Sequence, residues 1–62
     1  MKLKEFTAVM SKKQNVMIMP NIGDCGFYRY TVEHIPPMFL NAEVRDVRSH
    51  GYEIAIMVFV EG

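Results

Sequence analysis

The residues best suited to acid–base, nucleophilic or metal chemistry are one cysteine and two histidines, namely Cys25, His34 and His50. A nucleophile needs a general base within reach, and structural zinc sites use closely paired cysteine and histidine ligands. These three residues follow none of the paired spacings typical of zinc sites. The sequence therefore predicts no metal, no cofactor and no catalytic residue, and we expect a protein that is not an enzyme.

Cys25 lies in the sequence Gly-Asp-Cys-Gly, where a thiol on a flexible loop could be reactive. The neighbouring carboxylate of Asp24 disfavours the thiolate, which is the nucleophilic form. The flanking glycines lack the lysine and the following helix of a phosphate-binding loop. Both histidines adjoin residues typical of turns. We interpret Cys25 as a small residue near a hairpin tip and the histidines as turn residues.

Aromatic and cationic side chains alternate at residues 27–30, which read Phe-Tyr-Arg-Tyr. Aromatic rings stack on nucleic-acid bases, and a guanidinium group adds a cationic contact. Tyr28, Arg29 and Tyr30 therefore form a candidate nucleic-acid or nucleotide site. Seven basic and seven acidic residues give zero net charge, however, whereas proteins that grip phosphate backbones are usually basic. The charge balance argues against this alternative.

The elements that must position these side chains are organised around the last strand, at residues 52–60. Successive side chains of a strand point to opposite faces, and here both sets are apolar. Ile54, Ile56 and Val58 share one face, whereas Ala55 and Met57 belong to the other. A strand of this kind is predicted to lie in the middle of a sheet.

The preceding residues predict one helix and three further strands. Apolar residues at helical spacing favour a helix over residues 1–10. Pro37 is compatible with the first turn of a helix and favours a single helical turn at 37–40. The other strands are expected at residues 16–19, 27–32 and 42–48, the first two as an antiparallel hairpin. Val44 and Val47 have opposite parity, so the strand at 42–48 either contains a bulge near Arg45–Asp46 or lies at an edge. We expect Gly51 to take positive φ in the last turn.

The sequence thus predicts one α+β domain over residues 1–62. One N-terminal helix packs on a four-stranded, mainly antiparallel sheet, with a short helical turn after the second strand. One helix can cover only one face of that sheet, and an uncovered apolar face usually marks an interface. So small a domain is marginally stable and often gains stability by oligomerisation. We therefore expect a homodimer that forms through the uncovered face or through an edge of the sheet, with Tyr28, Tyr30, Met57 and Phe59 as partner-binding anchors.

The sequence also bears on the cellular compartment and on contact with membranes. No run of apolar residues approaches the ~18 that a membrane-spanning helix requires, and we identify no signal peptide. A single cysteine is typical of proteins in a reducing compartment. We expect a cytoplasmic protein without membrane contacts.

The pattern resembles small, uncharacterised reading frames of bacteriophages and mobile elements of Gram-positive bacteria. The resemblance rests on the segments Leu3-Lys4-Glu5-Phe6, Val32-Glu33-His34-Ile35-Pro36, Ala42-Glu43-Val44 with Val47, and Ile54, Ile56 and Val58 of the last strand. It implies an accessory protein in the cytosol of a bacterial host, and some proteins of this kind inhibit host defence enzymes by binding them. Together with the residues, it predicts a non-enzymatic protein-binding module that self-associates.

Overall fold

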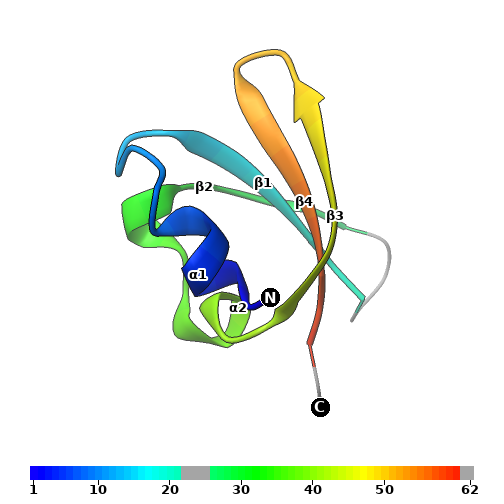
Figure 1. Cartoon of the computed structure of the whole chain (residues 1–62). Coiled ribbons are helices and arrows are strands. Elements are labelled where there is room, and N and C mark those ends of the chain that lie inside the picture. Colours follow the sequence, from blue (N-terminus) through cyan, green and yellow to red (C-terminus); the bar gives the residue numbers. More distant parts are fainter. Residues whose placement is uncertain (22–25, 61–62) are drawn as a thin grey trace.

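The protein is an α+β domain with a four-stranded mixed sheet (Figure 1). A computed structural model describes residues 1–21 and 26–60. The elements in chain order are α1 (Leu3–Thr7), β1 (Asn15–Pro20), β2 (Tyr28–Thr31), the 3₁₀ helix η1 (Val32–His34), α2 (Pro37–Leu40), β3 (Glu43–His50) and β4 (Glu53–Phe59).

The strands lie in the order β2-β1-β4-β3, so β4 occupies the interior position predicted for it. β1 pairs antiparallel with β2, and β3 pairs antiparallel with β4, as in two hairpins. β1 and β4 are parallel neighbours, with Val16 opposite Ile54 and Ile18 opposite Ile56. This parallel pairing, which joins the two hairpins, makes the sheet mixed.

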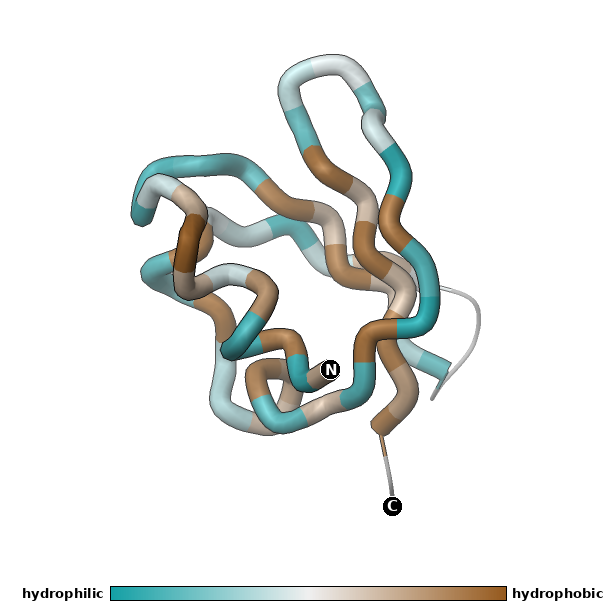
Figure 2. Tube along the Cα trace, in the orientation of Figure 1, coloured by the Kyte–Doolittle hydropathy of each residue, from teal (hydrophilic) through white to brown (hydrophobic). Residues whose placement is uncertain are grey.

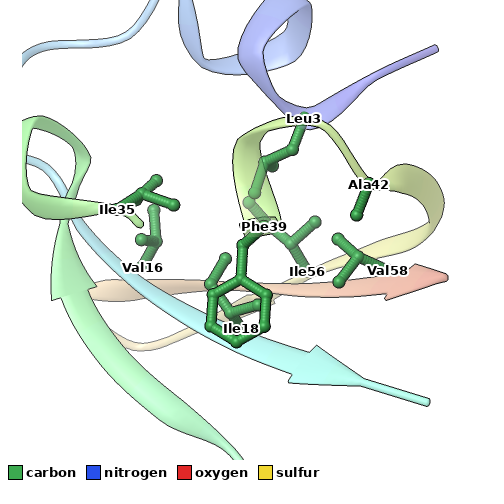
Figure 3. Packing of buried hydrophobic residues seen from close by; sticks show 8 residues of the cluster. All are labelled: Leu3, Val16, Ile18, Ile35, Phe39, Ala42, Ile56 and Val58. Atoms are coloured by element: carbon green, nitrogen blue, oxygen red, sulfur yellow. The ribbon is translucent and has the colours of Figure 1, made fainter. Parts of the chain in front are cut away.

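The hydrophobic core lies between the helical segments and one face of the sheet. Leu3, Val16, Ile18 and Ile56 are completely buried, and Phe39 from α2 packs among them. Figure 3 shows these side chains pointing toward one another from α1, α2, β1 and β4. The helical segments gather on one side of the sheet in Figure 1. The helix-covered face is thus the one that carries Val16, Ile18, Ile56 and Val58.

α1 is shorter than the helix expected at residues 1–10, because it ends at Thr7. The Thr7 hydroxyl donates a hydrogen bond to the Leu3 carbonyl at 3.0 Å, a local bond that competes with helix propagation. Leu3 N–H donates to the Ala42 carbonyl at 2.9 Å, which ties the start of the helix to the chain just before β3. This attachment and the burial of Leu3 hold a helix too short to be stable in isolation.

The helical turn after the second strand is confirmed as α2. Pro36 precedes it in extended geometry, and Pro37 occupies its first turn, where the missing N–H costs nothing. Asn41 ends the turn, with its backbone N–H and its side-chain amide both donating to the Pro37 carbonyl at 3.0 Å. α2 thereby directs Phe39 into the core.

β3 combines the two alternatives that its sequence left open, because it is an edge strand and also contains a bulge. Val44 pairs with Val58 and Asp46 with Met57, so Arg45 is the inserted residue. The bulge lets both Val44 and Val47 face the helix side. At the other end of β3, Gly51 has a φ of 63°, and no other described residue has positive φ. A glycine at the first position of a two-residue hairpin loop is typical of a type II′ turn.

Candidate functional site

The sheet face opposite the helices is called the open face here. Register and side-chain alternation place thirteen strand residues on it. They are Asn15, Met17 and Met19 of β1, Arg29 and Thr31 of β2, Glu43, Asp46, Arg48 and His50 of β3, and Glu53, Ala55, Met57 and Phe59 of β4. Figure 2 shows that hydrophobic residues continue along β4 at both parities. The open face therefore has an apolar centre, with charged residues on the strands around it.

The exposed apolar part of the open face lies toward the C-terminal end of β4. Met57 is 44% exposed and Phe59 is 37% exposed, although both belong to an interior strand. Phe27, just before β2, is 49% exposed. Exposed apolar side chains scattered singly are ordinary, whereas Met57 and Phe59 are next neighbours on one face of one strand. These two residues form the candidate contact surface.

Two arginine side chains lie over phenylalanine rings beside this surface. The guanidinium carbon of Arg29 lies 4.8 Å from the centre of the Phe27 ring, and that of Arg45 lies 4.9 Å from the centre of the Phe59 ring. Both distances are within the range of a cation–π interaction. The stacking leaves the ring of Phe59 partly accessible and places a flat cationic group at the border of the contact surface.

An ion pair crosses the other end of the open face. Arg29 on β2 reaches over β1 to Glu53 on β4, with its Nε 3.0 and 3.2 Å from the two carboxylate oxygens. Met17 on the intervening strand is only 7% exposed, and Ala55 beside it is 5% exposed. The helices do not cover this face of the sheet. The ion pair and the aliphatic stem of the arginine lie over its apolar centre instead.

A second charged pair lies on β3. The Arg48 Nε donates to one carboxylate oxygen of Asp46 at 2.9 Å, and the Val47 backbone N–H donates to the other at 3.0 Å. The hydrogen bond from Arg48, followed by that from Val47, lowers the pKa of Asp46 from its ordinary value of 3.8. Asp46 is therefore ionised at neutral pH and is engaged by its own strand.

The four anchors predicted from the sequence do not form one surface. Met57 and Phe59 lie on the open face, whereas Tyr28 and Tyr30 lie on the helix-covered face, opposite Ile18 and Val16 in the register. Their rings pack with Phe39 at centroid distances of 5.6 and 6.1 Å. Tyr28 remains 49% exposed at the rim of the core.

The predicted nucleic-acid trio is divided in the same way. Arg29 points to the open face, where it contacts Phe27 and Glu53, whereas Tyr28 and Tyr30 stack with each other at 6.5 Å on the opposite face. The three side chains therefore do not form one stacking platform. The partners that the fold gives to Arg29 are Phe27 and Glu53.

The two histidines lie apart from each other in the fold. His34 is in η1, where its Nδ1 lies 2.6 Å from the Thr31 hydroxyl, and His50 is the last residue of β3 beside the turn. Within residues 1–21 and 26–60 no cluster of three histidine, cysteine or acidic residues has the geometry to hold a metal ion. Cys25 and most of its loop lie outside the described residues. None of the helices in the described part of the chain has the length and apolarity to cross a bilayer.

Two members of this site were not identified as anchors from the sequence. Phe27 has the parity of Arg29, which is the signal that could have placed the two on one face. Arg45 gave no such signal, because its position over Phe59 depends on the bulge between Val44 and Asp46.

Comparison with protein-family models, with curated proteins and with solved structures finds no significant match to this chain.

Proposed function

We propose that this chain is a non-enzymatic protein-binding module that forms a homodimer through the open face of its sheet. The observation that carries the proposal is the exposure of Met57 and Phe59 on the interior strand β4. A strand that is apolar at both parities, as β4 is, is typical of a strand covered on both faces, and the helical segments cover only the other face. A second copy offers the same apolar surface and satisfies the requirement of a two-fold interface for self-complementarity.

The charges of the open face are compatible with this arrangement. Arg29 is paired with Glu53, Arg48 with Asp46 and Glu43 with the N-terminal amine inside each copy. Arg45, the other cation beside the contact surface, lies over the Phe59 ring. Rim charges of this kind contribute little to affinity, and the binding free energy would come from the apolar centre.

The size of the surface sets the expected affinity. Four strands of six, four, eight and seven residues, spaced about 4.8 Å apart, give a face of roughly 400 Å² in projection. A standard interface buries about 800 Å² per partner, so a dimer that used the whole open face would bury less than a standard interface and would be weak and transient. We therefore expect dissociation constants of order micromolar.

The resemblance to phage and mobile-element reading frames extends this proposal. It suggests an accessory protein that inhibits a host defence enzyme by occupying part of its surface. Met57 and Phe59 would anchor the dimer, and the exposed ring of Tyr28 at the rim of the opposite face would be left for a host protein. Tyrosine is enriched among residues that dominate binding energy.

The experiment that tests the dimer is light scattering over a concentration series spanning about 1 to 200 µM, a range that brackets micromolar affinity. The proposal predicts a mass that rises from that of one chain toward twice that value and changes little between low and high salt. A mass that stays at one chain throughout the series contradicts it.

A second candidate function, nucleic-acid binding, is favoured by one observation. The Arg29–Phe27 and Arg45–Phe59 stacks place two cationic groups and two partly exposed rings on the open face. Such pairs stack on bases in single-stranded nucleic-acid sites. The discriminating measurement is the fluorescence anisotropy of a labelled single-stranded oligonucleotide. Binding that weakens steeply with salt would support this candidate, and no binding at low salt would eliminate it.

A further inference from the structure

The long edge of the sheet, β3, is a place where association could also occur. Edge strands present unpaired backbone N–H and C=O groups, which another strand can use for pairing. The first residues of β3 are already covered, because Val44 N–H donates to the Met1 carbonyl at 2.9 Å. Residues 45–50 form the rest of this edge, and among the described elements no further strand pairs with it.

The turn at Gly51 determines which backbone groups of this edge point outward. In a hairpin with a two-residue loop, His50 and Glu53 exchange hydrogen bonds across the strands. Because antiparallel pairing alternates, the backbone groups of Arg48 also face β4, and those of Ser49 and Val47 face away. Val47 N–H is thus an edge donor that an added strand would use.

That donor is already engaged within its own strand. Val47 N–H donates to Asp46 Oδ1 at 3.0 Å, and Asp46 Oδ2 accepts from Arg48 Nε at 2.9 Å. Asp46 therefore uses both carboxylate oxygens along the edge. The bulge that inserts Arg45 immediately before it also interrupts the regular spacing that an incoming strand would need.

We propose that Asp46 closes the β3 edge against strand addition by a second copy of this chain. An incoming strand would have to take Val47 N–H from a carboxylate, separate Asp46 from Arg48, and remove water from both charges. Each of these steps is unfavourable, and natural sheets use charged edge residues and bulges in this way. Closure of β3 removes one of the two sheet edges, the other being β2, as a route of association that competes with the open face.

The variant that tests this proposal is Asp46→Ala, which removes the acceptor and frees the Val47 amide. Its matched control is Glu33→Ala, which loses the same charge at an exposed position in η1. We expect Asp46→Ala to give a weight-average mass at least about twice that of the wild-type chain at equal concentration, as expected when an edge is opened. Glu33→Ala should match the wild-type chain in sedimentation velocity.

Two further variants make each outcome decisive. In a double variant of Asp46→Ala with Met57→Lys, association should persist, because strand pairing at the edge uses backbone groups and does not need the Met57 side chain. This result separates a failure of the edge proposal from a failure of the proposed dimer.

Asp46→Asn keeps an acceptor oxygen for Val47 N–H but loses the charge, and should give a smaller increase in mass. If circular dichroism shows that Asp46→Ala is unfolded, the mass of the Asp46→Asn variant tests the proposal instead. A folded variant with the mass distribution of the wild-type chain overturns the proposal.

Discussion

Arg29 and Glu53 meet at 3.0 Å across β1, although they belong to β2 and β4 and are 24 residues apart in the chain. Their ion pair bridges β2 and β4 over β1, where Met17, opposite Arg29 in the register, is 7% exposed. It divides the open face into a covered polar end and an apolar end where Met57 and Phe59 remain exposed. The proposed contact surface is the part of the face that this pair does not cover.

Replacing Arg29 by alanine should uncover Met17. Surface ion pairs contribute about 0.2–1 kcal/mol, so we expect the free energy of unfolding to fall by less than about 1 kcal/mol. Peroxide oxidation of Met17, followed by mass spectrometry, should become several-fold faster relative to Met1, which is 67% exposed and serves as the internal reference. An unchanged relative rate would mean that the arginine stem does not cover Met17.

Replacing Phe39 by alanine should be the most damaging change outside the strands. The ring is 4% exposed and supports both Tyr28 and Tyr30. Truncations of a buried phenylalanine typically cost 3–5 kcal/mol, and a domain of this size has only about 3–9 kcal/mol in total. We expect urea unfolding to show a largely unfolded chain. Phe39→Leu keeps most of the volume and should remain folded, with a lower midpoint. A stable Phe39→Ala variant would contradict the assigned core.

The contacts of Asp46 should depend on pH in a defined direction. The hydrogen bonds from Arg48 and Val47 lower the pKa of Asp46 below 3.8, so the folded state favours the carboxylate. Their stabilising contribution is complete above the ordinary pKa and is lost as the pH falls through the lowered value. A carbon-13 NMR titration should place the Asp46 midpoint below 3.8, and Arg48→Gln should raise it. A midpoint at or above 3.8 would show that these contacts are not formed in solution.

Parity within single strands predicted much of this architecture. Apolar residues at both parities placed β4 inside the sheet, and the opposite parities of Val44 and Val47 indicated the bulge. The parallel pairing of β1 with β4 was not predicted, because it joins residues far apart in the chain, such as Val16 and Ile54. The end of α1 at Thr7 was also missed, since it depends on a side-chain hydrogen bond to Leu3.

The predicted anchors lie on two faces of the sheet. Side-chain alternation shows which residues of one strand share a face, but not which face of a neighbouring strand lies on the same side of the sheet. Tyr28 shares its face with Ile18 only through the register of β1 with β2, and that register depends on how the whole hairpin pairs. Once Ile18 faces the helices, Tyr28 must do so as well. The position of Arg45 over Phe59 could not be predicted either, because it follows from the bulge.

The most direct test of the central claim is sedimentation equilibrium of the wild-type chain, Met57→Lys and Val9→Lys at concentrations up to about 200 µM, well above a micromolar dissociation constant. Val9 is 91% exposed and lies just after α1 rather than on the open face, so it controls for the gain of a lysine. The account predicts that the wild-type chain and Val9→Lys approach twice the chain mass of 7.2 kDa, and that folded Met57→Lys stays at 7.2 kDa. A wild-type chain that remains at 7.2 kDa, or a Met57→Lys variant that dimerises as the wild-type chain does, would contradict it.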